Sequence, residues 1–320
     1  MRKKTKRWLL ILAFAALFCF SLNFRPHYAE TISVLRRSLI SAFSGAALCC
    51  AGAIFQTAFK NPIAAPNLLG ISTGVGIGNI AFVLTFQLAA YSFLPYRYIY
   101  CYALAILMVL LTVVCGRLTN RRFGGFSVEG MILAGMMITH LGQVVVQFFN
   151  YQLEADETGL VYIYTQISNG DILFVDDVSF TMFCVFLLLA GLPVILIRYR
   201  FNCVAFSDAE MKAAGVNNPR LRLVGLVCGS VMATVALIHC GDVGFLSMAV
   251  PFMARTPDSI DFRDVLFNSA LGGGIISLGA RTLLSFVTGA GYYMPVSVII
   301  TILAAPLFVR ALIRRGDAFV

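Results

Sequence analysis

The chain is organised around a polar island between two long apolar blocks, Phe206-Ser-Asp-Ala-Glu-Met-Lys-Ala-Ala-Gly-Val-Asn-Asn-Pro-Arg-Leu-Arg222. Ser207 and Glu210 form a capping box, in which the hydroxyl and the carboxylate satisfy amide groups of a first helical turn. Gly215 can close that helix in a left-handed conformation, and Pro219 prevents its continuation. The pattern predicts a helix of about two turns at 208–214, which is marginal in water on its own. This helix is therefore either a solvated connector or a segment that docks on a partner.

Composition identifies the surroundings of the island. Of the 320 residues 59% are apolar and 12% are charged, and the mean hydropathy is +0.86, which exceeds what a soluble core requires. A membrane span needs about 20 apolar residues. The sequence therefore predicts an all-α, polytopic membrane protein, a single domain over 1–320 with about ten transmembrane helices, the eighth of them short. The predicted spans are 8–24, 38–59, 68–90, 98–116, 129–150, 178–197, 222–239, 243–254, 264–288 and 294–312.

The net charge of +9 is distributed as the topology of a membrane protein requires. With the N-terminus inside, 19 of the 24 Lys and Arg residues lie on the cytoplasmic side, four lie outside and Arg281 lies within a span. This distribution satisfies the positive-inside rule, and the opposite orientation does not. We therefore expect cytoplasmic N- and C-termini, a short N-terminal tail at 1–7, a cytoplasmic segment at 198–222, and no nucleic acid partner. The first span could be a signal peptide, but no small-residue cleavage site follows it, so an uncleaved span is favoured.

Motifs for catalysis and for metal binding are absent from the sequence. His27, His140 and His239 are scattered, no P-loop occurs, and the nine cysteines lie mostly inside apolar runs without CxxC spacing. We therefore expect no catalytic residue, no metal ligand and no cofactor in this chain. The span centres are also nearly free of the carboxylates that ion-coupled carriers use. That favours a channel, or a permease driven by a separate motor.

Two further regions show distinct patterns. Small residues recur at helical spacing in the second and third spans, which indicates close helix packing: Ser41, Gly45, Cys49 and Gly52, then Gly70, Gly74 and Gly78. The predicted external loop at 151–177 contains six acidic residues and no Lys or Arg. This loop is either a solvated face or a docking site for an extracellular partner.

The fifth span carries a polar stripe: Met136, His140, Gln143, Gln147 and Asn150. At 100° per residue these side chains fall within an arc of about 80°. Polar groups facing lipid would lose their hydration without compensation, so the stripe faces either neighbouring helices or a water-filled cavity. Interhelical hydrogen bonding and a translocation path both remain open.

Several motifs occur in a recognisable order along the chain. They are Asn61-Pro-Ile-Ala-Ala-Pro-Asn-Leu-Leu-Gly-Ile-Ser-Thr-Gly74, Leu133-Ala-Gly135, Ala214-Gly-Val216 with Arg220-Leu-Arg222, Gly241-Asp-Val-Gly-Phe-Leu246, Val250-Pro-Phe-Met-Ala-Arg255, and Pro295 with Ala305-Pro306. Together, over about 34–313, they resemble the FecCD family, the permeases of ABC importers for iron-siderophore complexes, haem and cobalamin. The chain departs from the family pattern at Ala65, Asp242, Phe252, Met294 and Ser297.

The resemblance implies a type II ABC importer permease fold in the cytoplasmic membrane of a prokaryote. It also implies a second permease subunit, identical or different, a cytoplasmic ATPase dimer that holds ATP and Mg, an extracellular or periplasmic substrate-binding protein, and contact with membrane lipid. By resemblance the segment at 208–214 is the coupling helix that sits on the ATPase. The residues assigned to coupling are Ser207, Asp208, Glu210, Lys212, Ala214, Gly215, Val216 and Arg220.

The resemblance also assigns two further sites. Arg37 and Arg281 match family positions that dock the binding protein, and Arg36 can replace a family arginine that is Val34 in this chain; binding of lipid phosphates is the alternative for Arg36 and Arg37. The family lines its path with the fifth helix, which favours the cavity for the polar stripe. The predicted function is the permease of an ATP-driven importer for an iron-siderophore or related metal chelate. A metal-chelate exporter or an ion-coupled carrier is the alternative, and an intramembrane enzyme is disfavoured.

Overall fold

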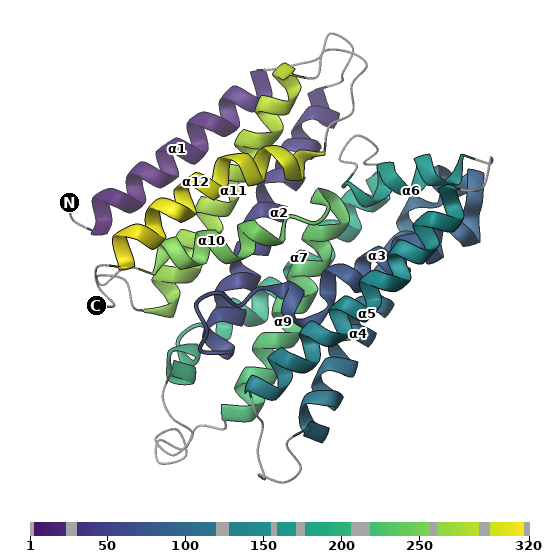
Figure 1. Ribbon diagram of the computed structural model, residues 1–320. Coiled ribbons are helices and arrows are strands. Elements are labelled where there is room, and N and C mark those ends of the chain that lie inside the picture. The colour runs from purple at the N-terminus through teal and green to yellow at the C-terminus, as the bar shows by residue number, and fades with distance from the viewer. Residues whose placement is uncertain are drawn as a thin grey trace.

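The computed structural model describes residues 3–23, 31–119, 128–154, 159–170, 177–205, 218–255, 261–287 and 295–316. Every regular element within these ranges is a helix (Figure 1). The α-helices are α1 (Lys3–Asn23), α2 (Thr31–Ala58), α3 (Ile71–Phe86), α4 (Arg97–Thr119), α5 (Val128–Glu154), α6 (Leu160–Ser168), α7 (Asp177–Ile197), α9 (Asn218–Cys240), α10 (Gly244–Ala254), α11 (Phe262–Val287) and α12 (Val296–Gly316). Three 3₁₀ helices join them: η1 (Pro66–Leu69), η2 (Gln87–Tyr96) and η4 (Arg200–Ala205). Each predicted span overlaps a helix, and the prediction of an all-α protein is confirmed.

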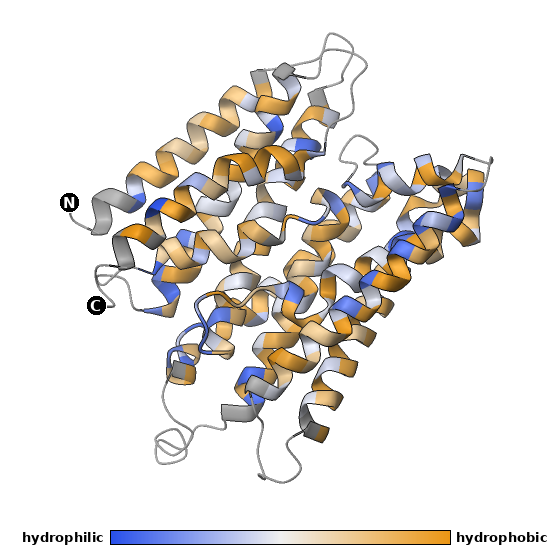
Figure 2. Cartoon of the chain, in the orientation of Figure 1, coloured by the Kyte–Doolittle hydropathy of each residue, from blue (hydrophilic) through white to orange (hydrophobic). Residues whose placement is uncertain are grey.

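Length and hydropathy single out the helical stretches that can cross a membrane. Among the described residues five qualify, namely Ile32–Ala58, Ile71–Gly116, Gly130–Glu154, Asp177–Ile197 and Arg220–Cys240. Shorter apolar helices occur at Arg7–Leu22, Phe245–Ala254 and Val296–Ala311. Hydrophobic residues cover most of the helical surface, and hydrophilic residues gather near many of the helix ends (Figure 2). The prediction that the eighth span is short is confirmed by α10, which has 11 residues.

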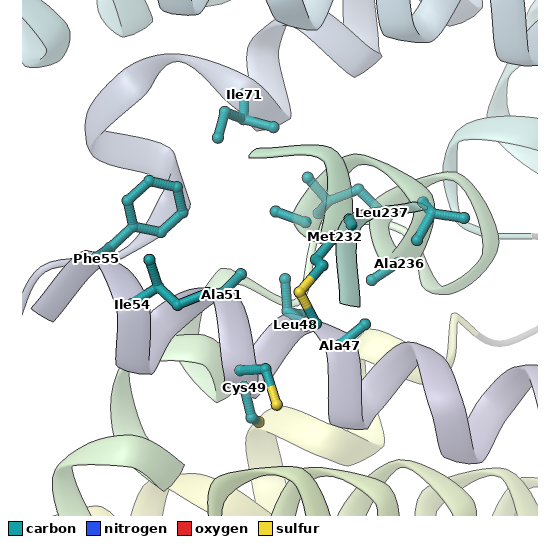
Figure 3. Packing of buried hydrophobic residues seen from close by; sticks show 14 of the residues in the cluster. Ala47, Leu48, Cys49, Ala51, Ile54, Phe55, Ile71, Met232, Ala236 and Leu237 are labelled. Atoms are coloured by element: carbon teal, nitrogen blue, oxygen red, sulfur yellow. The ribbon is translucent and has the colours of Figure 1, made fainter. Parts of the chain in front are cut away.

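Helix α2 forms the centre of the bundle. It packs against α11, α9 and α10, and Figure 3 shows Leu48 of α2 beside Met232 of α9. A Cβ atom added at Gly45 would lie 2.4 Å from the carbonyl oxygen of Gly273 in α11, and one at Gly52 would lie 1.7 Å from that of Ser247 in α10. The small residues of α2 therefore allow two neighbouring backbones to approach, as predicted.

A second group of helices is formed by α3, α4 and α5. A Cβ atom at Gly74 would lie 2.6 Å from the Cα of Ala105, and one at Gly78 would lie 2.7 Å from the Cα of Cys101. The predicted close packing of the third span is thus confirmed, with α4 as its neighbour. Together with α6 and η2, these helices enclose a small apolar cluster at one end of the group.

Two predictions from the sequence are wrong in detail. The span 68–90 is not one helix, because Gly70 has a left-handed φ of 72° between η1 and α3, and Gln87 has a φ of 47° where α3 ends. The acidic region 151–177 is not simply a solvated loop, because α6 lies within it. Its Leu160, Ile163 and Ile167 are buried, and their spacing of three and four residues is that of an amphipathic helix.

Contacts between helix ends show which ends lie on the same side of the bundle. On one side Arg7 near the start of α1 pairs with Asp264 near the start of α11, and Arg255 at the end of α10 bonds the last turns of α2. On the other side Arg36 near the start of α2 pairs with Asp177 at the start of α7. We call the first the inner side and the second the outer side. Figure 1 shows the start of α1 and the end of α12 near each other, at the inner side.

Candidate translocation path and docking sites

Helix α5 contacts its neighbours through one narrow face. A Cβ atom at Gly135 would lie 1.7 Å from the carbonyl oxygen of Leu68, and one at Gly142 would lie 2.4 Å from Cγ2 of Thr73. Between these glycines the hydroxyl of Thr139 donates to the carbonyl oxygen of Asn67 at 2.8 Å. The Leu-Ala-Gly motif of α5 and the Asn-Pro motif before α3 are therefore two halves of one contact.

The polar stripe of α5 lies beside this packed face. Met136, His140, Gln143 and Gln147 are all exposed, and Met136 is exposed by 43%. Nδ1 of His140 donates to the carbonyl oxygen of Met136 at 2.7 Å, which holds the ring along the helix. Asn150 is half-buried and lies close to Tyr164 of α6. Four of the five stripe residues thus share one exposed strip of surface, and the fifth contacts α6 at the outer end.

The third face of α5 is apolar and also exposed. Leu133, Met137, Leu141, Val144 and Phe148 are each exposed by 57–67%. In a membrane such a face lies against lipid or against another apolar protein surface. The polar stripe is therefore bounded by the packed face on one side and by this apolar face on the other.

A buried arginine joins four helices, at the start of α4, the last turns of α6 and α9, and the middle of α3. Arg97, the first residue of α4, is only 5% exposed. Its Nε donates to Oδ1 of Asn79 in α3 at 2.8 Å, and its Nη2 donates to the carbonyl oxygens of Ile167 in α6 at 2.9 Å and of Ile238 in α9 at 2.7 Å. The last turns of α6 and α9 expose carbonyl groups without intrahelical partners, and these carry partial negative charge. One guanidinium therefore caps two helices.

Two glycines complete this junction. A Cβ atom at Gly170 would lie 2.3 Å from the backbone nitrogen of Gly241, and Gly241 ends α9 with a left-handed φ of 69°. The ends of α6 and α9 thus touch backbone to backbone. Asp242, which follows this contact and precedes α10, is exposed. We call Arg97, Gly170 and Gly241 with their partners the outer junction.

The proposed docking arginines lie near the outer ends of α2 and α11. Nη1 of Arg281 donates to Oγ of Ser38 at 2.7 Å and to Oγ of Ser21 at 3.4 Å, so α11 is tied to α2 and α1. Arg37 is half-buried and close enough to Arg281 for their charges to repel. Arg36 points elsewhere: it pairs with Asp177 of α7 and lies 5.9 Å from the ring of Phe180. Arg281 and Arg37 therefore share a neighbourhood, and Arg36 is engaged separately.

Most of the predicted coupling segment lies outside the described residues. Ser207, Asp208, Glu210, Lys212, Ala214, Gly215 and Val216 belong to this part, whereas Arg220 lies in α9, where it is exposed. The segment that precedes it, η4, is firmly held. Phe201 is 1% exposed and its ring lies 4.8 Å from that of Phe262, and Oδ1 of Asn202 accepts from the backbone nitrogen of Phe262 at 2.6 Å.

The sequence interpretation missed the outer junction. Arg97 precedes an apolar run and is one of the four basic residues that the sequence places outside, and its buried role depends on partners from distant segments. One feature of the junction is visible in the sequence: Gly241 follows an apolar run, and glycine in a left-handed conformation commonly ends a helix. Among the described residues no cluster of three or more His, Cys, Asp or Glu could hold a metal ion.

Comparison with known proteins gives consistent relatives. The model of a family described as the FecCD transport family matches residues 11–315. The Fe(3+) dicitrate transport system permease protein FecC of Escherichia coli (strain K12) is 30% identical over 290 residues, which cover 88% of this chain and 82% of that protein. The hemin transport system permease protein HmuU of Yersinia pestis is 27% identical over 285 residues, with the same two coverages of 88% and 82%.

Solved structures agree on the fold. An ABC transporter assigned to the metal-chelate type, in an inward-facing conformation, superposes with a TM-score of 0.82 at 20% identity and covers 97% of this chain and 99% of its own. PsaBC from Streptococcus pneumoniae, solved with a Fab, gives a TM-score of 0.59 at 15% identity and covers 93% of this chain and 95% of its own.

Proposed function

The chain belongs to the FecCD transport family, and from this premise we propose that an iron-siderophore or related metal chelate crosses the cytoplasmic membrane through it. Family membership itself makes the protein an ABC importer permease, integral to the cell membrane of a prokaryote. The relatives are named for an iron citrate complex and for hemin. These cargoes share chelated iron but differ in shape and charge, which supports the broad class of cargo and leaves its exact member open.

The exposed polar stripe of α5 carries this proposal. A large polar chelate needs a surface that replaces part of its hydration and still releases it. Neutral amides, an imidazole and a thioether do this, whereas fixed charges would retain an ionic ligand. Met136, His140, Gln143 and Gln147 supply such groups along three turns of helix, and Asn150 extends them towards α6.

The partners follow from the same premise. An ATPase dimer holding ATP and Mg would bind the inner side through the segment Ser207–Val216 and Arg220, and this chain itself would bind no cofactor and catalyse no reaction. A substrate-binding protein would dock at the outer side on Arg281 and Arg37, with Arg36 in a lesser role. A second permease subunit would face the stripe from across the path. In this arrangement both termini are cytoplasmic.

The test is thiol labelling of α5 in a background without the nine native cysteines. Single cysteines at positions 140, 143 and 147 should react with a membrane-impermeant maleimide in proteoliposomes, and their rates should change when nucleotide and binding protein are added. Cysteines at 141, 144 and 145 are the matched controls, because they are exposed on the apolar side of the same turns. Equal labelling of both sets, or no labelling in any state, would overturn the assignment of the path.

A second test concerns coupling. Gly215→Val should prevent the left-handed closure of the predicted helix at 208–214, so association with the ATPase and chelate uptake should fall while the amount of protein in the membrane stays normal. Gly191→Val is the matched control, since a Cβ atom at Gly191 meets no atom within 4 Å. Normal uptake and normal ATPase association in Gly215→Val would remove this segment from the coupling site.

The alternative of an ion-coupled carrier receives less support from the positions of the carboxylates. Glu154 is the last residue of α5, Asp177 is the first of α7 and Asp264 is the third of α11. Carboxylates at helix ends cannot relay protons across the midplane. Uptake that continues without ATP, and stops when a protonophore is added, would favour the carrier.

A further inference from the structure

The inner end of α7 carries an exposed aromatic ring between two arginines. Leu188, Leu192 and Leu196 follow one another at four-residue spacing on α7 and are exposed by 64%, 58% and 71%. Tyr199, 56% exposed, comes three residues later and continues this row. Exposed leucines on a membrane helix face the lipid chains, and Tyr is enriched where such a face meets the headgroups. Tyr199 therefore lies at the membrane interface.

Two guanidinium groups flank this ring. The Cζ atom of Arg198 lies 5.0 Å from the centroid of Tyr199, and that of Arg263, from the start of α11, lies 4.7 Å from it. Both distances are within the range of cation–π contacts. The two arginines also lower the pKa of the Tyr199 hydroxyl, because both hydrogen-bond to it. Residues 65 positions apart in the sequence are thus gathered at one point of the interface.

The arrangement is held in place from behind. Nε of Arg263 donates to Oδ2 of Asp261 at 2.8 Å, and Nδ2 of Asn202 donates to Oδ1 of Asp261 at 3.1 Å. Phe201, buried beneath, contacts Phe262. Because these contacts fix both the chain after α7 and the start of α11, the side chain of Arg263 and the backbone next to Arg198 are in place before any ligand arrives, and less conformational entropy is lost on binding.

The cluster carries a net positive charge at the surface of the inner side. Asp261 balances Arg263, whereas within the described part of the chain no carboxylate pairs with Arg198, and the neighbouring Arg200 is exposed as well. Guanidinium groups match the geometry of phosphate oxygens. We propose that Arg198, Tyr199 and Arg263 form a binding site for the phosphate headgroup of an anionic phospholipid, whose acyl chains lie along Leu196 and Leu192.

A lipid fits this surface better than the other two occupants of similar chemistry. Free phosphate would gain nothing from the row of leucines, and a cytoplasmic protein would have to approach through the hydrocarbon region to reach them. An anionic lipid fits both the arginines and the row of leucines, because its phosphate binds the first and its acyl chains cover the second. The anionic cytoplasmic leaflet attracts basic side chains by roughly 1 kcal/mol each. The site also lies directly before the predicted coupling segment.

Native mass spectrometry of the purified full-length protein tests the site. The protein is titrated with phosphatidylglycerol and, separately, with phosphatidylcholine of the same acyl chains. Wild type should retain phosphatidylglycerol preferentially. Arg198→Gln and Arg263→Gln should each lower this retention about fivefold, as expected for the loss of one interfacial charge. Arg198→Lys should retain part of it, because the charge remains and the planar group is lost.

Controls separate this proposal from its competitors. Arg310→Gln removes an exposed arginine near the inner end of α12, outside this cluster, and should lower phosphatidylglycerol retention less than Arg198→Gln does. Arg198→Gln removes no contact behind the ring, so it should keep the melting temperature and remain informative if Arg263→Gln misfolds. Equal phosphatidylglycerol binding by wild type and Arg198→Gln would overturn the proposal. Displacement by millimolar inorganic phosphate, or weakened binding of the cognate ATPase subunit with unchanged lipid binding, would also overturn it.

Discussion

Helices α2 and α5 have nearly the same length, 28 and 27 residues, and opposite surroundings. In the apolar window of α2 83% of the residues are buried within the protein, whereas in that of α5 the share is 17%. Hydropathy does not distinguish them, because lipid and protein interior are both apolar. What differs is the placement of small residues. In α2 the small residues allow close contact on two faces, with α10 and with α11. In α5 Gly135 and Gly142 allow close contact on only one face.

This difference in packing suits α2 and α5 to different roles. A helix packed on several sides fixes the bundle, and its movement would disturb every neighbour. A helix packed on one side can present a different surface to a path, to lipid or to a second subunit without disturbing the core. The following predictions test whether α2 and the outer junction are rigid parts, and whether the exposed face of α5 and the outer arginines serve function with little effect on stability.

The largest effect is expected at Gly52 of α2. In Gly52→Val the Cβ atom would lie 1.7 Å from the backbone oxygen of Ser247, and no rotamer can relieve a backbone contact. We expect α10 to separate from α2 at a cost of about 3 kcal/mol or more, with loss of the monodisperse peak in size-exclusion chromatography. Gly191→Val, in open space on α7, should elute as wild type. A normal elution profile for Gly52→Val would mean that α10 is not seated on α2.

The outer junction should rank next. Arg97→Met leaves the carbonyl oxygens of Ile167 and Ile238 and the amide oxygen of Asn79 without a charged donor. We expect a loss of about 3 kcal/mol, since hydrogen bonds to a charged group contribute about 1.5–3 kcal/mol each. The loss is less than their sum because the backbone nitrogen of Gly170 still bonds the carbonyl oxygen of Ile167, and Sγ of Cys101 still bonds Oδ1 of Asn79. Scanning fluorimetry in detergent should show a melting temperature lower by roughly 6–12 °C.

The comparison for this variant is an arginine outside the junction. Arg310→Met alters an exposed side chain on α12 and should shift the melting temperature by no more than about 2 °C. If both substitutions shift it equally, Arg97 is not a cap for α6 and α9. Arg97→Lys should lie between wild type and Arg97→Met, because one ammonium cannot reach all three acceptors in the fork geometry of Arg.

The sequence predicts the parts that depend on local pattern. Apolar blocks place the long helices, although α2 starts at Thr31, well before its predicted span 38–59, and small residues at four-residue spacing identify the tight contacts of α2 and α3. The polar stripe of α5 is equally readable, and the structure exposes four of its members. Whether the stripe lines a path stays a prediction, because exposure in one subunit does not identify the neighbour.

Other features depend on contacts between distant segments. Arg97 looks like a topological charge until α6 and α9 bring their carbonyl groups to it, 70 and 141 residues away. Helix α6 is hard to predict because acidic residues around it dominate the composition of 151–177, although Leu160, Ile163 and Ile167 keep a helical spacing. The division of 68–90 depends on a left-handed Gly70, which packing against α4 and α5 selects.

A moderate effect on transport without an effect on folding is expected from the stripe. The pair Gln143→Leu and Gln147→Leu removes two exposed amides from α5 and should leave the melting temperature unchanged. We expect iron-chelate uptake to fall about fivefold, equivalent to one net hydrogen bond of about 1 kcal/mol. Val144→Leu with Val145→Leu changes the adjacent apolar side and should transport normally. Normal uptake by the glutamine pair would place the stripe outside the path.

The smallest effect is expected at Asp177, and it divides the outer arginines into two kinds. Arg281 is tied to Ser38 and Ser21 inside the bundle, whereas Arg36 pairs with Asp177, whose side chain is 77% exposed. An exposed ion pair contributes less than about 1 kcal/mol, so Asp177→Asn should leave the melting temperature almost unchanged.

The substitution Asp177→Asn also releases Arg36 for an incoming carboxylate. If the binding protein docks on these arginines, its affinity for Asp177→Asn should therefore rise by up to about fivefold at low salt, and the gain should vanish at high salt because exposed charges are screened. Asp264→Asn breaks an Arg–Asp pair at the inner side, the one with Arg7, and should leave docking unaltered. Surface plasmon resonance with the binding protein over a salt series measures the change. Weaker docking of Asp177→Asn would mean that Asp177 orients Arg36 for docking and does not compete for it.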